Sequence, residues 1–223
     1  MQNINTFFFD LDGTLVDSVP DLAKALNLTL IDYQRPTYDE NTVRHWVGNG
    51  ARVLVERGLS GNTNAKPDFT PNEIDAALEK FLFYYRTLDI KDTVLYDGVS
   101  ATLNSLKNRG YKLALITNKP SEFIEPILSS FSLSHLFSLT VGGDSLPEKK
   151  PSARPLLYAC ETLDVLPSQC VMVGDSKNDI QAAKAANIKS IGLTYGYNYG
   201  ESIAAYQPDW VFNSFSEILS ISS

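Results

Sequence analysis

Short apolar runs alternate with segments of helical period over most of the 223 residues of this chain. The runs are rich in β-branched and aromatic residues, and they predict strands at residues 5–9, 112–117, 139–142, 170–174, 190–193 and 210–212. The segments between them predict helices at residues 99–109, 121–131, 153–163 and 179–186. Apolar strands that are separated by helices form a parallel sheet covered on both faces, so we predict an α/β fold with a Rossmann-like core.

The stretch from about residue 16 to residue 92 breaks this alternation. It holds three helical patterns, at residues 20–33, 40–58 and 72–88, and no convincing strand. We therefore predict a catalytic core formed by residues 1–15 and 93–223, with residues 16–92 inserted as a helical cap domain.

Charge and composition exclude several classes of partner. The net charge of −7 and the isoelectric point near 4.8 leave no basic face for nucleic acid or an anionic membrane. No apolar run approaches the length that spans a bilayer, and nothing resembles a signal peptide. The two cysteines lack metal-ligand spacing, which favours a reduced, cytoplasmic protein. We expect a monomer or a small homo-oligomer that acts on a small molecule.

Polar residues follow the predicted strands where each strand ends. Parallel sheets bind ligands beyond the carboxyl ends of their strands, so these residues are the candidate site. Each has an ordinary alternative as a turn residue, a helix cap or solvated surface. Those alternatives leave unexplained why all of them stand at strand ends or at a helix start. The candidates are Asp10, Asp12, Thr117, Asn118, Lys150, Asp175 and Asp179.

Two carboxylates, Asp10 and Asp12, stand two residues apart directly after the first predicted strand. Side chains at this spacing on an extended chain point to the same side. Two like charges so close require a compensating cation or a shared proton, and a divalent metal is one such cation. A strand end followed by an Asx-turn is the alternative interpretation.

Four segments of the sequence resemble the motifs of the haloacid dehalogenase superfamily of phosphotransferases. They are Asp10-Leu11-Asp12-Gly13-Thr14, Thr117, Lys150 and Gly174-Asp175-Ser176-Lys177-Asn178-Asp179, and the resemblance covers essentially the whole chain. The insertion resembles the helical cap of that superfamily. Among the members of the superfamily, phosphoglycolate phosphatases are the most similar to segments 47–51, in the cap, and 192–198, near the end of the chain. The resemblance implies a Mg²⁺-dependent phosphomonoesterase of a small phosphorylated metabolite, foremost 2-phosphoglycolate.

The residues suggest how such a reaction would proceed. Asp10 leaves the strand directly and is assigned as the nucleophile that forms an aspartyl-phosphate. Asp12 would protonate the leaving alkoxide and then activate water. Asp10, Asp175 and the main-chain carbonyl of Asp12 would hold Mg²⁺, which prefers hard oxygen ligands. The phosphoryl oxygens would be held by Lys150, by Thr117 with Asn118, and by free backbone N–H groups. Asp179 would hold a metal-bound water or orient Lys150.

The predicted cap supplies candidates for substrate selection. The loop Gly48-Asn49-Gly50 allows the backbone to approach a small ligand, and the helix that follows it has an amino end that favours anions. Arg52 is a candidate cation for a substrate carboxylate, with plain surface as the alternative.

Two other functions compete with a phosphatase. A sugar-phosphate mutase of the same superfamily would use the same aspartyl-phosphate but return the phosphoryl group to a second hydroxyl. A binding or regulatory protein could keep the fold without turnover, and the intact set of Asp10, Asp12, Lys150 and Asp175 argues against it. Dehalogenation is disfavoured because the dehalogenases of the family lack the acid at the position of Asp12.

Overall fold

A six-stranded parallel sheet forms the centre of the computed structural model, which describes residues 4–64, 68–89 and 91–221. The strand order is β5-β4-β1-β6-β7-β8, and all five neighbouring pairs are parallel. The strands are β1 (Thr6–Phe9), β4 (Lys112–Ile116), β5 (Leu139–Val141), β6 (Cys170–Gly174), β7 (Lys189–Leu193) and β8 (Trp210–Phe212). The predicted α/β fold and all six predicted strands are confirmed, with ends that differ by at most one residue.

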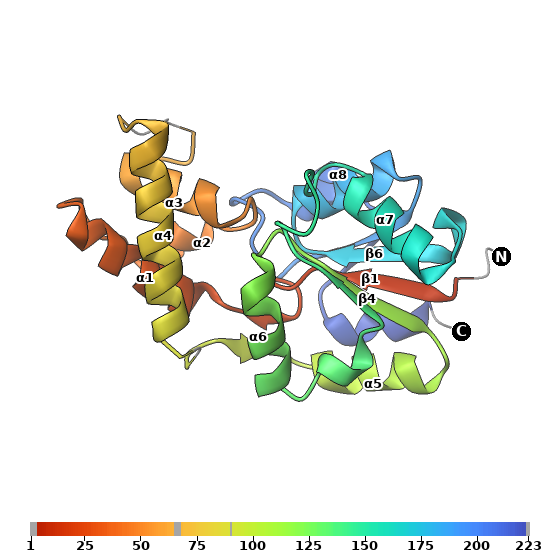
Figure 1. Ribbon diagram of the computed structural model, residues 1–223. Coiled ribbons are helices and arrows are strands. Elements are labelled where there is room, and N and C mark those ends of the chain that lie inside the picture. Colours follow the sequence, from red (N-terminus) through yellow and green to blue (C-terminus); the bar gives the residue numbers. More distant parts are fainter. Residues whose placement is uncertain (1–3, 65–67, 90, 222–223) are drawn as a thin grey trace.

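Both faces of the sheet are buried, as the continuous apolar strands require. In β1, Phe7 and Phe9 point into one apolar cluster with α5 (Val99–Asn108) and α6 (Ile124–Ser130), while Phe8 points into another with α7 (Arg154–Leu163) and α8 (Lys177–Ala185). In Figure 1, α7 and α8 lie on one side of the sheet and α5 on the other. The predicted core helices are therefore confirmed in position. Cys160 and Cys170 are buried free thiols in the second cluster.

A helical segment with its own apolar core lies beyond the carboxyl ends of the strands (Figure 1). It consists of α1 (Val19–Asp32), α2 (Glu40–Arg44), α3 (Ala51–Ser60) and α4 (Pro71–Thr87). The prediction of one helical segment over residues 40–58 is wrong, because the chain leaves the helix between α2 and α3. Gly48 and Gly50 have φ values of 118° and 89° there, which no helix contains.

A short antiparallel pair, β2 (Val16–Asp17) with β3 (Val94–Leu95), lies where the chain enters and leaves this helical segment. The sequence gives no sign of it, because two residues are too few to show an alternating pattern. The boundaries predicted for a cap at residues 16 and 92 stay a prediction.

The remaining helices of the described residues are five short 3₁₀ helices: Ser121–Phe123, Ser134–Leu136, Pro167–Gln169, Ile203–Tyr206 and Phe215–Ser220. The first directly precedes α6, and the last packs on α5. Within the described ranges, none of the helices combines the length and the apolar character needed to cross a bilayer.

Candidate active site

Three carboxylates converge at the carboxyl edge of the sheet. Asp10 follows β1, Asp175 follows β6, and Asp179 lies in the first turn of α8. One oxygen of each lies within 4.8 Å of the others, and all three residues are buried. The parallel pairing of β1 with β6 accounts for this, because it brings both strand ends to the same edge.

The turn after β1 lets Asp175 approach the backbone. Leu11 accepts hydrogen bonds from the N–H groups of Thr14, Leu15 and Val16. Gly13 has a φ of 87°, and a Cβ atom there would collide with the Asp175 carboxylate. The Thr14 hydroxyl donates to Asp175 Oδ1 at 2.6 Å. Gly13 and Thr14 therefore shape and hold the position of this carboxylate.

A second loop closes around Asp175 from the other side. The Tyr197 N–H donates to Asp175 Oδ2 at 2.5 Å, and the Tyr197 hydroxyl bonds to Asp17 and the Ser18 N–H. Burial raises the pKa of Asp175 well above its usual value, and the neighbouring Asp179 and Asp10 charges add to this. A cation close to this carboxylate would favour its ionised form.

Lys150 is the ammonium of the acidic cluster. Its Nζ lies 2.6 Å from Asp179 Oδ1 and 3.0 Å from Asp10 Oδ1, with only 1% of the side chain exposed. Burial disfavours its charge, but the two carboxylates raise the pKa of Lys150, so it stays an ammonium. The second oxygen of Asp179 accepts from the Ser176 N–H and hydroxyl. Both Asp179 oxygens are thus occupied.

The charges of the cluster do not balance. Three carboxylates face one ammonium, which leaves two more negative than positive charges in a buried place. Burial raises the pKa of Asp10 from 3.8 to about 6, although the Lys150 ammonium opposes the change. Asp10 Oδ1 also lacks a partner that meets hydrogen-bond geometry. These residues fit a hard divalent cation, whose preferred ligands are such oxygens.

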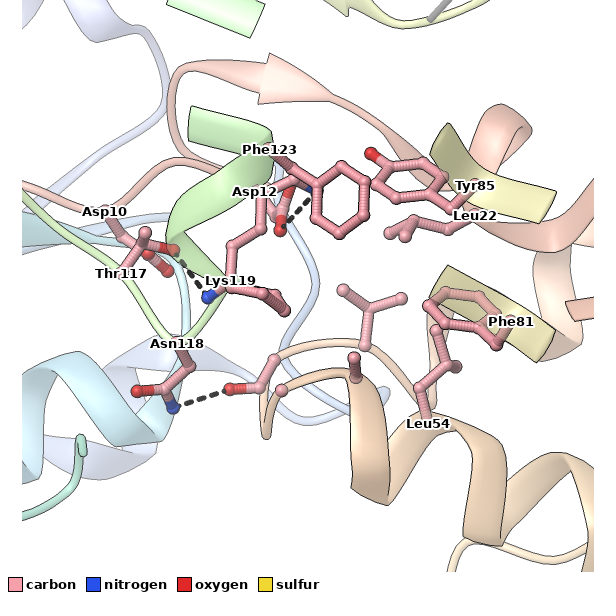
Figure 2. Close-up of a pocket in the computed structure, with 15 residues that line it drawn as sticks. Asp10, Asp12, Leu22, Leu54, Phe81, Tyr85, Thr117, Asn118, Lys119 and Phe123 are labelled. Carbon is pink, nitrogen blue, oxygen red and sulfur yellow. Dashed lines mark hydrogen bonds and ion pairs between the residues drawn. The ribbon is translucent and has the colours of Figure 1, made fainter. Parts of the chain in front are cut away.

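A pocket of about 40 Å³ opens beside Asp10 between the sheet edge and the helical segment (Figure 2). One wall is polar, and the other is mostly apolar and comes from the helical segment. Its lining residues are Asp10, Asp12, Leu22, Val47, Gly48, Gly50, Ala51, Leu54, Phe81, Tyr85, Thr117, Asn118, Lys119, Pro120 and Phe123.

Asp12 lies in this pocket and points away from the acidic cluster. Its Oδ1 accepts from the Ser18 hydroxyl at 2.6 Å, and its two oxygens lie 3.0 and 3.2 Å from Lys119 Nζ. Sequence reasoning missed Lys119, although it directly follows the singled-out Thr117 and Asn118. Burial disfavours the Lys119 ammonium, but the Asp12 carboxylate raises the pKa of Lys119 above its usual value.

A family model described as haloacid dehalogenase-like hydrolase matches residues 7–193. The chain belongs to the haloacid dehalogenase-like hydrolases. A phosphoglycolate phosphatase from Colwellia psychrerythraea is 53% identical to this hydrolase, over 98% of this chain and 97% of that protein.

Two solved structures resemble the hydrolase over all or nearly all of their lengths. The crystal structure of a predicted phosphoglycolate phosphatase from Haemophilus somnus has a TM-score of 0.93 and 45% identity, and covers 100% of both chains. CbbY from Rhodobacter sphaeroides, in complex with phosphate, has a TM-score of 0.81 and 26% identity over 96% of both chains. The prediction of a phosphatase of this superfamily is confirmed.

The structure brings the predicted core residues of the hydrolase together. Asp10, Asp12, Thr117 and Asn118 line the pocket, and Lys150 lies behind them. The Thr117 hydroxyl accepts from the Lys119 N–H at 3.2 Å, so it faces the same turn. The Asn118 amide donates to Gly48 O at 3.0 Å and Lys150 O at 2.9 Å, which ties the sheet edge to the helical segment.

The predicted residues of the helical segment divide into two groups. Gly48 and Gly50 line the pocket. The Asn49 side chain instead accepts from the Tyr199 hydroxyl at 2.8 Å and lies outside the lining.

Arg52 also lies outside the pocket lining, and its contact with a substrate carboxylate stays a prediction. Its guanidinium pairs with Asp75 and with Glu56, and 39% of its side chain is exposed. Although Ala51 faces the pocket, the next position on the helix points to these acids at the surface. These ion pairs favour the alternative of Arg52 as plain surface.

Proposed function

We propose that this hydrolase is a Mg²⁺-dependent phosphoglycolate phosphatase that converts 2-phosphoglycolate to glycolate and phosphate through an aspartyl-phosphate. The observation that carries the proposal is the buried cluster of Asp10, Asp175 and Asp179 with Lys150, beside a small pocket. The near-full-length relatives named phosphoglycolate phosphatase support the choice of substrate.

Mg²⁺ would be held by Asp10, by Asp175 and by the main-chain carbonyl of Asp12. When bound, it supplies positive charge that offsets the phosphoryl oxygens and the excess of carboxylates. Asp179 acts through Lys150, because its oxygens are already bonded to Lys150 and Ser176. Lys150 then holds its ammonium toward the phosphoryl group without leaving Asp10.

Asp10 supplies a carboxylate oxygen that attacks phosphorus in line with the leaving alkoxide. The bond from phosphorus to the ester oxygen breaks, and Asp12, which takes up a proton from solvent before the attack, gives that proton to the oxygen. Glycolate leaves. Asp12, now a carboxylate, takes a proton from a water that attacks the phosphorus of the aspartyl-phosphate, and the phosphorus–oxygen bond to Asp10 breaks to release phosphate. Thr117 and Lys150 hold the phosphoryl oxygens during both steps.

The helical segment would act as the cap that closes over the substrate. Its apolar side chains Leu54, Phe81 and Leu22 face the polar wall of the pocket (Figure 2). The pocket is small, about 40 Å³, and this supports a short substrate over a long sugar bisphosphate. Excluding bulk water also strengthens the electrostatic interactions of the cluster.

Phosphate release tests the proposal. The purified protein is incubated with 2-phosphoglycolate and with longer phosphomonoesters, in Mg²⁺ and in EDTA. We expect Mg²⁺-dependent release that is fastest for 2-phosphoglycolate and absent in Asp10→Asn, because an amide cannot accept the phosphoryl group.

Asp12→Asn provides the matched control for the covalent route. With an aryl phosphate, whose leaving group needs no proton, it should accumulate phosphoenzyme that acid quenching traps. No phosphate release by the unaltered protein from any ester in Mg²⁺ would contradict the function. Turnover by a sequence-verified Asp10→Asn protein would contradict the aspartyl-phosphate.

A further inference from the structure

Lys119 is the lone cation among the described residues that line the pocket. Only 2% of its side chain is exposed, and its ammonium rests against the ring of Tyr85, 4.7 Å from the ring centroid. Its partner is the Asp12 carboxylate (Figure 2). Nothing in the reaction described above uses this buried ammonium.

The hydroxyl of Tyr85 is a second unused polar group at the same place. It is buried in the pocket wall beside the Lys119 ammonium, and it has no partner that meets hydrogen-bond geometry. Around it the wall is apolar, with Phe81 and Phe123 in ring contact with Tyr85. A buried hydroxyl without a partner costs stability unless a ligand satisfies it. An ammonium from the turn after β4 and a hydroxyl donor from α4, lying among apolar side chains, suit an anionic acceptor such as a carboxylate.

The distance along the backbone favours a short substrate. Thr117, which faces the phosphoryl group, and Lys119 are two residues apart in the turn after β4, and the Lys119 N–H is bonded to the Thr117 hydroxyl. One rigid turn therefore carries both a phosphoryl contact and the ammonium, and a molecule with its two charged ends close together reaches both.

Asp12 cannot act as the general acid while its carboxylate is paired with the Lys119 ammonium. Both Asp12 oxygens face the ammonium, and Oδ1 also accepts from Ser18, so the carboxylate is held in an orientation toward Lys119. An incoming carboxylate offers Lys119 another anion in the same pocket. The exchange keeps the ammonium paired throughout, which a buried charge requires.

We propose that Lys119, assisted by the Tyr85 hydroxyl, binds the carboxylate of the substrate, and that its transfer from Asp12 to this carboxylate releases Asp12 toward the leaving oxygen. Lys119 is then the specificity-determining residue of the pocket. The inference rests on the proposed function and deepens it. It also moves carboxylate recognition from Arg52, on the surface of α3, to the turn after β4.

The kinetic test compares 2-phosphoglycolate with ethyl phosphate, a two-carbon ester that lacks the carboxylate. We expect the unaltered enzyme to prefer 2-phosphoglycolate in kcat/KM. Lys119→Met keeps most of the side-chain bulk and removes the charge. It should reduce that preference by about ten- to a hundredfold, the value of one charge-assisted hydrogen bond in a closed site. Lys119→Arg should restore part of it.

Two further variants separate recognition from folding. Tyr85→Phe keeps the ring contacts and removes only the hydroxyl, so it should fold normally and reduce the preference several-fold. Lys149→Met removes another half-buried ammonium, which bonds the Asn49 carbonyl outside the pocket lining. It should change both substrates by the same factor. Equal losses on both substrates in Lys119→Met would overturn the proposal.

Calorimetric titration tests recognition without turnover. The probes are 3-phosphonopropionate, which has the carboxylate, and propylphosphonate, which lacks it. We expect tighter binding of 3-phosphonopropionate to the unaltered protein and loss of that difference in Lys119→Met. A difference that persists in Lys119→Met overturns the role of Lys119, whatever the turnover. If the protein shows the expected binding difference but hydrolyses no phosphate ester, the proposed function is refuted and the role of Lys119 in binding the carboxylate is not.

Discussion

Asp10 and Asp12 stand two residues apart, yet their replacement by asparagine should shift stability in opposite directions in metal-free protein. Asp10 belongs to a cluster with excess negative charge, and burial raises its pKa from 3.8 to about 6. Keeping it ionised in the folded state costs about 1.4 kcal/mol for each pKa unit, so the rise of about two units corresponds to about 3 kcal/mol. Asp10→Asn removes this cost, and Lys150 keeps Asp179 as its partner.

The pH dependence has a definite sign. A carboxyl group whose folded pKa is raised binds its proton more tightly in the folded state. The stability that the protonated Asp10 carboxyl contributes is therefore fully present below the pKa of the unfolded state, and it is lost as the pH rises through the pKa of the folded state. The advantage of Asp10→Asn should be near its maximum at pH 8 and should shrink as the pH falls from about 6 toward 4.

Asp12→Asn should have the opposite effect. Asp12 is paired with the buried Lys119 ammonium at 3.0 Å, and losing that carboxylate leaves an uncompensated charge. Removing one partner of a buried ion pair destabilises by about 3 kcal/mol or more.

The assay is urea unfolding in EDTA at pH 5, 6 and 8, followed by the fluorescence of Trp46 and Trp210. A matching melting experiment should show shifts of about 6–12 °C up for Asp10→Asn and at least as far down for Asp12→Asn. A destabilised Asp10→Asn protein at pH 8 would refute the account of the charge excess. So would an advantage that grows as the pH falls.

Three other predictions follow from the same geometry. In a thermal-shift titration, Mg²⁺ should raise the melting temperature of the unaltered protein because it binds only the folded cluster, and Asp175→Asn should remove most of that rise. Ca²⁺ should also raise the melting temperature, but it should support little turnover because its coordination is larger and looser. Arg52→Ala should change kcat/KM for 2-phosphoglycolate less than about twofold, because Arg52 pairs with Asp75 and Glu56 outside the pocket lining. A tenfold loss of kcat/KM would show that Arg52 contacts the substrate. Asn118→Ala should raise KM and lower the melting temperature together, because its amide bonds both Gly48 and Lys150, and a normal melting curve would contradict this tie.

The sequence by itself determined the sheet and the chemistry at its edge. Continuous apolar strands separated by helical periods allow little besides a covered parallel sheet, and such a sheet collects its strand ends at one edge. This is why Asp10, Asp175 and Lys150 could be expected together from positions far apart in the chain. Gly13 belongs to the same local signal, since a turn that approaches a carboxylate so closely leaves no room for a Cβ atom.

Only the tertiary structure decided which side chains face the pocket and with what partners. A helical pattern gives the existence of a helix but not the direction of one side chain relative to a neighbouring helix, so it could not place Arg52 beside Asp75. A lysine after Asn118 reads as solvated surface in the sequence. It is buried here because Asp12 and Tyr85, from two distant parts of the chain, contact it, while Ser18 bonds the Asp12 carboxylate. Burial and charge pairing arise from such long-range contacts, and these set the pKa of each group and the place where a substrate can bind.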